Sequence, residues 1–171
     1  PGVIMQQGST ALVEMGFLER SQEKILQDLK TKFDSEFLSF NISNDILHTL
    51  WKKMIIVGAF GTIMTSFRMS FRELIDSKYG EKILSETMKE IKKVGISENI
   101  QLDSVNISEI IKELRLEADE MTSSMFNDLK SKKPLEIDSI LGHVVNLAQS
   151  KNIDLPYSET LVSSLENFKR G

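Results

Sequence analysis

From residue 44 to the end of the chain, apolar residues recur with the period of a helix, and this pattern constrains the fold more than any other feature. A long helix is predicted at 45–66, around the apolar run 54–64. Further helices are predicted at 70–78, 81–94, 106–116, 135–150 and 157–169. Gly95 is predicted to end the 81–94 helix, and Asn106 to cap the 106–116 helix. Because amphipathic helices bury their apolar faces against one another, the sequence predicts a mainly α domain.

Residues 1–43 follow a different pattern, in which short extended segments flank one helix. Extended segments are predicted around 3–5, 11–13 and 37–42. Ser21 is predicted to cap the intervening helix, whose apolar stripe includes Ile25, Leu29 and Phe33. The order strand, helix, strand is typical of the end of an α/β domain. The sequence therefore predicts two parts, a short α/β remnant at 1–43 and a helical domain at 44–171.

The composition supports a folded domain and excludes several classes of binding site. Hydrophobic residues make up 40% and charged residues 27% of the 171 residues, which is enough apolar content for one sizeable core. The net charge of −4 argues against a nucleic-acid partner, because phosphate-binding surfaces need a concentrated basic face. With no cysteine and two histidines, no metal site is expected.

Localisation signals are weak in this sequence. The apolar run 54–64 is shorter than the roughly 20 residues that span a bilayer, so a buried helix is predicted and no membrane partner. No charged leader with an apolar region opens the chain at Pro1, and we expect a cleaved or truncated product. The absence of cysteine is compatible with a reducing compartment, and a cytoplasmic protein is expected.

Two neighbouring lysines stand out within the long predicted helix. Lys52 and Lys53 lie about 100° apart on a helix, so one can face a cleft while the other faces water. Trp51, beside them in an apolar helical pattern, is predicted to anchor the core rather than to stack on a ligand.

The second group of candidate residues comes far downstream. Glu136 follows Pro134 in the first turn of the predicted 135–150 helix, where the helix dipole alone would favour a carboxylate. Ser123 and Ser124 offer hydroxyls and backbone amides to a carboxylate, although serines are common at helix ends. A lysine and a glutamate in a shared cleft can orient and protonate a carbonyl oxygen as the carbonyl is reduced.

The order and spacing of these segments resemble the ketopantoate reductase (2-dehydropantoate 2-reductase) family. The resemblance is carried by Leu-Trp-Lys-Lys at 50–53, Thr-Ser-Ser-Met-Phe-Asn-Asp at 122–128, Pro-Leu-Glu-Ile-Asp at 134–138, Gly142, Asn152-Ile153 and Pro156. It implies a helical C-terminal domain of the 6-phosphogluconate-dehydrogenase-like type. It also implies that residues 1–43 are the end of a Rossmann-type nucleotide domain, most of which is missing from the chain.

The resemblance also implies an activity, the NADPH-dependent reduction of ketopantoate or an analogous 2-oxo acid to the 2-hydroxy acid. In the family, the lysine matching Lys53 is the general acid and holds the substrate. The glutamate matching Glu136 assists at the nicotinamide ribose and in the active site, and the serines matching Ser123 and Ser124 bind the substrate carboxylate. NADPH would be held mainly by the missing nucleotide domain.

Three positions depart from the family pattern. Asparagines are usual one and two helical turns after the lysine and at one later position, where this chain has Val57, Gly61 and Phe71. These changes leave the substrate open between ketopantoate and a more apolar 2-oxo acid. They also leave open a divergent reductase of unknown substrate, or a noncatalytic helical module that forms a homodimer. An upstream Gly-x-Gly-x-x-Gly in the complete reading frame would favour the enzyme.

Overall fold

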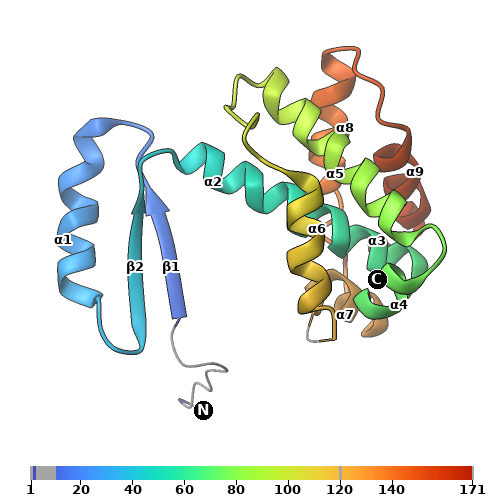
Figure 1. Ribbon diagram of the computed structural model, residues 1–171, viewed down its shortest axis with the longest axis horizontal. Coiled ribbons are helices and arrows are strands. Elements are labelled where there is room, and N and C mark those ends of the chain that lie inside the picture. Colours follow the sequence, from blue (N-terminus) through green and yellow to red (C-terminus); the bar gives the residue numbers. More distant parts are fainter. Residues whose placement is uncertain (1, 3–10, 120, 171) are drawn as a thin grey trace. The chain divides into compact units, whose positions relative to one another are not determined.

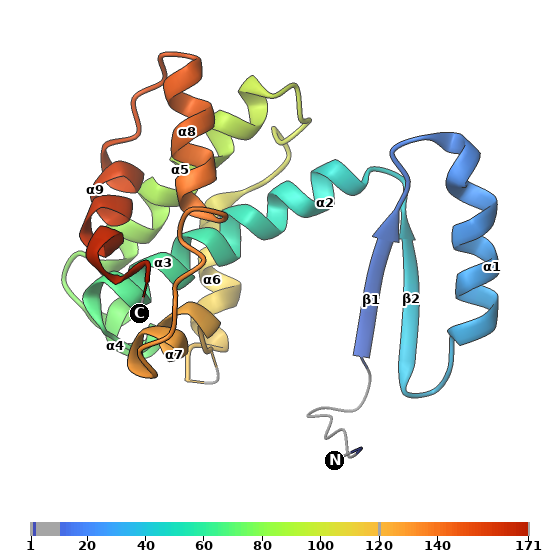
Figure 2. The ribbon, with the colours of Figure 1, turned by 180° about the vertical axis from the view of Figure 1, so that it is seen from behind.

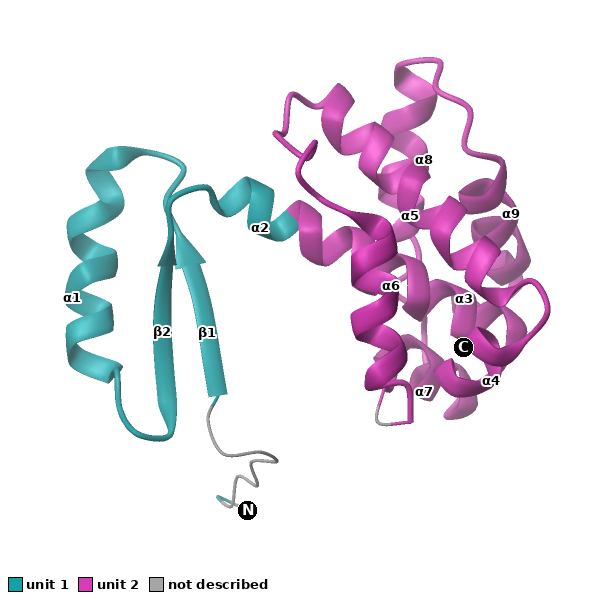
Figure 3. Ribbon diagram, in the orientation of Figure 1, with its two compact units in different colours: residues 1–50 teal, residues 51–171 magenta. Residues whose placement is uncertain are grey.

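The computed structural model describes residues 2, 11–119 and 121–170. Compactness divides the chain into two units, residues 1–50 and 51–171 (Figure 3). The extended segment predicted around 3–5 lies outside the described residues. The assignment of 1–43 to a nucleotide-domain remnant and 44–171 to a substrate domain stays a prediction.

Unit 1 contains a strand, a helix and a second strand that pairs in parallel with the first. The elements are β1 (Ala11–Gly16), the short 3-10 turn η1 (Arg20–Gln22), α1 (Glu23–Phe33) and β2 (Leu38–Ser43) (Figure 1). The register runs from Ala11 opposite Leu38 to Gly16 opposite Ser43. The strands predicted at 11–13 and 37–42, and the helix between them, are confirmed. The predicted cap at Ser21 is wrong, because Ser21 lies inside η1 and Gln22 occupies the N-cap position of α1.

The apolar stripe of α1 is exposed in this unit. Ile25 is 60% exposed, and Leu29 and Phe33 are exposed as well. Both faces of a parallel sheet are normally covered, and its helices normally bury such stripes. Unit 1 therefore leaves exposed an apolar helix stripe of the kind that an α/β layer normally buries.

Unit 2 is built from helices, which confirms the mainly α fold class. A continuous helix comprises α2 (Ile46–Lys53), the π turn η2 (Met54–Gly58) and α3 (Ala59–Phe67), of which the residues before 51 belong to unit 1. It is followed by α4 (Phe71–Asp76), α5 (Gly80–Ser97), α6 (Ile107–Leu116), α7 (Ser124–Lys130), α8 (Leu141–Ser150), α9 (Pro156–Leu165) and the 3-10 turn η3 (Glu166–Phe168) (Figure 2).

Side-chain caps set where several of these helices begin. Ser70 and Glu73 form a reciprocal capping box at α4. The predicted cap at Asn106 is confirmed, since its side chain accepts hydrogen bonds from the backbone N–H groups of Ser108 and Glu109.

The long helix supplies the centre of the unit 2 core. By length and composition the 22-residue helix Ile46–Phe67 could cross a membrane. It is longer than the apolar run 54–64, on which the prediction of a buried helix is based. However, the seven residues 59–65 of α3 are all buried, and α3 packs against α5, α7 and α9. Core packing therefore accounts for the apolar composition of residues 59–65, as the prediction of a buried helix expects, whereas only 39% of the most apolar window of the whole helix is buried.

Gly95 does not end a helix. It is buried inside α5, which continues to Ser97. A Cβ atom at Gly95 would lie 2.4 Å from Leu102 Cδ1 and 2.8 Å from Trp51 Cε3. The glycine therefore allows Trp51 to pack against the core, and the predicted anchoring role of Trp51 is confirmed.

Replacing Gly95 by alanine is expected to lower the free energy of unfolding by about 1–3 kcal/mol, because the added methyl group overpacks the contact with Leu102 and Trp51. Urea unfolding followed by circular dichroism would measure this change. Gly61→Ala is the control, since a Cβ there meets only Ser123 Oγ at 3.3 Å. An equal loss in both variants would argue against the packing explanation.

The helix predicted at 135–150 begins later than expected. Turns occupy 137–140, and α8 starts at Leu141. Leu135 and Ile137 are both buried, and this spacing of two does not fit one face of a helix. The backbone N–H of Leu135 donates to Lys169 O at 3.3 Å, and that of Gly142 donates to Ile137 O at 2.8 Å. Glu136 therefore lies before α8 and not in its first turn.

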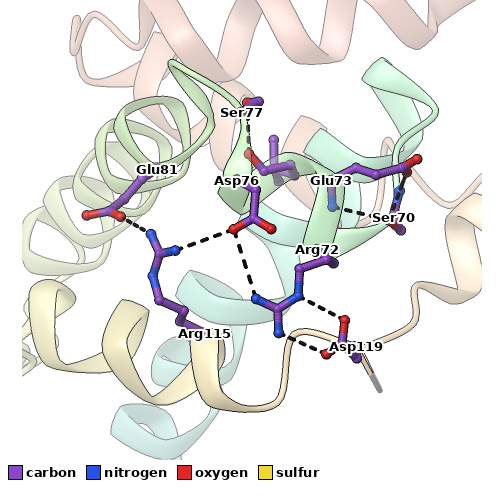
Figure 4. Close-up of polar contacts among 9 residues, drawn as sticks. Ser70, Arg72, Glu73, Asp76, Ser77, Glu81, Arg115 and Asp119 are labelled. Atoms are coloured by element: carbon purple, nitrogen blue, oxygen red, sulfur yellow. Dashed lines mark hydrogen bonds and ion pairs between the residues drawn. The ribbon is translucent and has the colours of Figure 1, made fainter.

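An exposed network of ion pairs joins α4, α5, α6 and the segment after α6 (Figure 4). Arg72 donates two hydrogen bonds to Asp119, from Nε to Oδ1 at 2.8 Å and from Nη2 to Oδ2 at 2.9 Å. Arg115 pairs with Glu81 and lies 3.6 Å from Asp76 Oδ1. The acidic segment after α6 is thus engaged through Asp119 with arginine.

The Arg72 hydrogen bond lowers the pKa of Asp119 below its ordinary value. Because the folded-state pKa is lower than the unfolded one, the contribution to stability is complete above the unfolded pKa and is lost as pH falls through the folded pKa. Asp119→Asn is expected to lower stability slightly near neutral pH and to flatten the acid side of the stability curve. Urea unfolding at a series of pH values checks this, with the exposed Asp154→Asn as the control. An acid side unchanged by Asp119→Asn would exclude this role.

Candidate active site

Lys53 ends α2 and immediately precedes the π turn. Its side chain is exposed and makes no hydrogen bond or ion pair with any residue that the structure describes. Lys52 is likewise exposed and makes no hydrogen bond or ion pair with any described residue. An ammonium group without a protein partner keeps all three donors available to a ligand.

The π turn η2 aligns residues that an ordinary helix would spread apart. Residues eight positions apart lie about 80° apart on an α-helix, at 100° per residue. The hydrogen bonds of a π turn join residues five apart, so each residue rotates the chain by less than in an α-helix. The π turn therefore removes most of the about 80° between Lys53 and Gly61. Lys53, Val57 and Gly61 therefore form one row along the helix, which we call the Lys53 row.

The Lys53 row has one basic residue and no other polar side chain. Val57 is 41% exposed, and Gly61 has no side chain. The third position that departs from the family pattern, Phe71, is fully buried and packs edge-on against Phe60 at 5.8 Å between ring centroids. Phe71 is thus a core residue, whereas Val57 is open to a ligand.

Ser123 lies against the far end of the Lys53 row. It is the N-cap of α7, and its hydroxyl accepts a hydrogen bond from Phe126 N at 3.2 Å. The same hydroxyl donates to Gly61 O at 3.4 Å, across 62 residues of sequence. Ser123 is only 6% exposed, whereas Ser124 is exposed. The structure therefore gives Ser123 a structural contact and leaves the Ser124 hydroxyl open.

Glu136 lies in the turn that packs beside the π turn. Its side chain is exposed and unpaired within the described part of the chain, and its backbone oxygen accepts from Ser139 N and Ile140 N, each at 3.1 Å. Ile140 Cγ2 lies 3.6 Å from the position of a Cβ on Gly58. Ser123 thus contacts the helix at Gly61, and the turn that follows Glu136 lies beside Gly58. No direct contact joins Lys53 to Glu136 in the described residues.

Lys169 holds both flanks of Glu136, and the sequence did not predict this. Its Nζ lies 2.5 Å from Asp138 Oδ1 and 2.8 Å from Glu166 Oε1. Hydrogen bonds to Asp138 and Glu166 raise the pKa of Lys169 above its ordinary value. Together with the Leu135 N–H bond to Lys169 O, this ion pair ties the C-terminal segment to both flanks of Glu136.

Two buried threonines near the Lys53 row differ in hydrogen bonding. Thr65 Oγ1 donates to Gly61 O at 2.7 Å. Thr62 Oγ1 is buried with no hydrogen-bond partner among the residues described. A buried hydroxyl without a partner costs roughly 1–3 kcal/mol of desolvation free energy.

Thr62→Val is expected to raise the free energy of unfolding by about 1 kcal/mol, because it removes an unpaired hydroxyl at nearly constant volume. Thr65→Val is expected to lower it by about 1 kcal/mol, because it removes a made hydrogen bond. Chemical denaturation of the two matched variants measures both. Destabilisation by Thr62→Val equal to that of Thr65→Val would show that the Thr62 hydroxyl has a partner.

Comparison with known families identifies the helical part of the chain. The family model described as ketopantoate reductase PanE/ApbA C terminal matches residues 45–169. A 2-dehydropantoate 2-reductase from Pyrococcus abyssi is 24% identical over 156 residues, covering 91% of this chain and 51% of the relative. The chain spans about half the length of the curated relatives that it matches.

Solved structures share the fold at low sequence identity. A ternary structure of D-mandelate dehydrogenase with NADH and anilino(oxo)acetate superposes with a TM-score of 0.81 at 22% identity, over 92% of this chain and 52% of that one. A dimeric ketopantoate reductase from Staphylococcus aureus superposes with a TM-score of 0.78 at 19% identity, over 90% of this chain and 52% of that one. The fold and the family model agree with the resemblance drawn from the sequence. The chain therefore belongs to the ketopantoate reductase family, and residues 45–169 are its C-terminal helical domain.

Proposed function

We propose that this chain is the substrate-binding half of an NADPH-dependent reductase that converts a 2-oxo acid into the corresponding 2-hydroxy acid. The observation that carries this proposal is the exposed Lys53, unpaired among the described residues, on a helix that Ser123 contacts at Gly61 and that the turn after Glu136 flanks at Gly58. π turns are rare and frequently lie at functional sites, which supports the placement.

In this proposal Lys53 acts as the general acid. Its ammonium donates a hydrogen bond to the 2-oxo oxygen and transfers a proton to that oxygen as the carbonyl carbon is reduced. The exposed Ser124 hydroxyl donates to the substrate carboxylate, and Ser123 supports the start of α7 through its bond to Gly61. The product is the neutral hydroxyl of the 2-hydroxy acid, and the lysine regains a proton from solvent.

The residues present fit only a small part of a nicotinamide cofactor. The sequence contains no Gly-x-Gly-x-x-Gly phosphate loop, so the dinucleotide would be held mainly by the rest of the protein. Glu136, exposed and unpaired among the described residues, can accept hydrogen bonds from ribose hydroxyls. When bound, the reduced nicotinamide supplies a hydride to the carbonyl carbon.

The Lys53 row favours a 2-oxo acid with an apolar side chain over ketopantoate. A substrate side chain lying beside Val57 meets its isopropyl group, and neither that group nor the missing side chain of Gly61 can bond a hydroxyl. A buried hydroxyl without a partner weakens binding. The D-mandelate dehydrogenase with the similar fold was solved with anilino(oxo)acetate, which is compatible with a bulky apolar acid.

The proposal is tested by measuring cofactor oxidation by the full-length protein. Ketopantoate, 2-oxoisovalerate, phenylglyoxylate and pyruvate would each be assayed with NADPH and with NADH. We expect the highest kcat/KM for 2-oxoisovalerate or phenylglyoxylate, with NADPH preferred. A folded protein that turns over none of these acids with either cofactor would contradict the proposal and favour a noncatalytic helical module.

A homodimer is proposed for the full-length protein as well. The ketopantoate reductase from Staphylococcus aureus with the same fold is dimeric. Light scattering coupled to size-exclusion chromatography would show twice the monomer mass across a range of concentrations. A constant monomer mass would remove this part of the proposal.

A further inference from the structure

A basic hollow lies in unit 2 where α7 and the segment after it meet Arg68 and η3. It encloses about 470 Å³, and its charged lining residues are Arg68, Lys130, Lys132 and Lys133. Its apolar lining consists of Phe126, Leu129 and Phe168. None of its charged lining residues is acidic, although the whole chain has a net charge of −4. A volume of this size suits a small organic molecule.

The cations around this basic hollow are poorly neutralised by the protein itself. The Arg68 guanidinium lies 5.2 Å from the centre of the Phe168 ring, and Lys130 Nζ lies 4.4 Å from the centre of the Phe126 ring. Among the described residues, only Lys133 reaches a carboxylate, that of Asp128 at 4.0 Å. Positive charges against a concave apolar wall concentrate a field that attracts anions.

Two of the basic lining residues also have a left-handed backbone conformation. Four described residues other than glycine have positive φ, namely Arg68, Asn99, Lys132 and Asn152. Asparagine is a usual residue in this left-handed conformation, whereas long side chains are disfavoured there. The two basic residues, with φ of 55° and 54°, both line the basic hollow. Arg68 is the C-cap of α3 and Lys132 follows the end of α7, so this conformation reflects helix termination and allows glycine variants at both positions.

We propose that the basic hollow binds a small aromatic anion, whose phosphate or carboxylate meets the basic side chains while its ring packs on Leu129 and the two phenylalanines. Ammonium and guanidinium groups held beside ring faces can meet an anionic head without first breaking an ion pair. The basic hollow shares no lining residue with the Lys53 site. Its ligand is therefore distinct from the 2-oxo acid of the proposed reaction, and its test does not depend on turnover.

The probe is phenyl phosphate, titrated into the full chain by isothermal titration calorimetry. Inorganic phosphate tests the binding of the anionic head alone, and phenol tests the binding of the ring alone. We expect saturable one-to-one binding of phenyl phosphate, at least about tenfold tighter than inorganic phosphate, and no measurable binding of phenol. Absence of saturable phenyl phosphate binding would overturn the proposal. Equal affinity for inorganic phosphate would overturn the role of the aromatic lining.

The left-handed backbone supplies variants that are expected to fold. Arg68→Gly and Lys132→Gly remove the basic side chains and suit positive φ, so they should not destabilise the chain. Together they are expected to weaken phenyl phosphate binding by at least about tenfold. Asn99→Gly and Asn152→Gly make the same backbone change away from the basic hollow and should leave the affinity unchanged. Unchanged affinity in the Arg68→Gly/Lys132→Gly variant would contradict the site.

Discussion

Lys53→Ala is expected to lower kcat of the full-length protein by about 10²–10⁴-fold, the range typical of losing a positioned general acid. The ammonium is exposed and has no partner among the described residues, so its loss should leave folding intact. Steady-state cofactor oxidation with the preferred 2-oxo acid measures the effect, and urea unfolding checks that stability changes by less than about 0.5 kcal/mol.

Lys52→Ala is the matched control for this prediction. Lys52 is adjacent, exposed and unpaired in the described structure, but it points about 100° away from Lys53. The kcat of the Lys52→Ala variant should stay within about threefold of that of the parent, as expected for a surface residue away from the chemistry. If Lys52→Ala and Lys53→Ala lose activity equally, the assignment of the acid to Lys53 is wrong.

Lys53→Arg separates proton transfer from substrate binding. Arginine keeps the positive charge and can hold the 2-oxo acid, but it does not give up a proton in the usual pH range. KM should change little, while kcat should fall nearly as far as in the alanine variant. A kcat close to that of the parent would show that Lys53 only binds the substrate and that another group supplies the proton.

The helical fold could be predicted because the helical period in this sequence is strong and several caps are local. Asn106 at the start of α6 needs only its own neighbours to accept hydrogen bonds, so sequence reasoning locates it correctly. Gly95 was misread, because a glycine near a helix end resembles a stop signal. Its actual role depends on Trp51 and Leu102, which are distant in sequence.

The sequence suggests which residues form the candidate site, but not how the chain arranges them. The resemblance selected Lys53, Ser123, Ser124 and Glu136, and their catalytic roles stay predictions. The π turn after Lys53 leaves no clear mark on the apolar run 54–58, because any apolar helix sequence can accommodate it. The turn holding Glu136 depends on Lys169, whose contacts arise only when the chain folds.

The structure also separates two serines that the sequence treats alike. Ser123 and Ser124 are adjacent and chemically identical, so only burial and hydrogen bonding can distinguish them. Ser123 is committed to Phe126 and Gly61, whereas Ser124 is open. If the proposed site is right, Ser124 is the serine available to the substrate carboxylate, and Ser123 fixes the local backbone.

Val57→Asn is expected to shift the preference of the full-length protein toward ketopantoate by about 10²-fold in the ratio of kcat/KM values, because it places an amide beside Lys53 that can bond a substrate hydroxyl. Val57 is 41% exposed, so an amide there is not forced into the core. Gly61 is the less suitable position, since even a Cβ there comes within 3.3 Å of Ser123 Oγ.

Val57→Ala distinguishes a new hydrogen bond from the loss of an apolar contact. It removes the same isopropyl group without adding an amide, so ketopantoate should gain no advantage beyond about threefold. Competing ketopantoate against 2-oxoisovalerate with each variant gives the ratio directly. The same ratio in Val57→Asn and Val57→Ala would mean that the substrate side chain does not lie along the Lys53 row. A selective gain in Val57→Asn would instead place the substrate there and identify position 57 as a determinant of specificity.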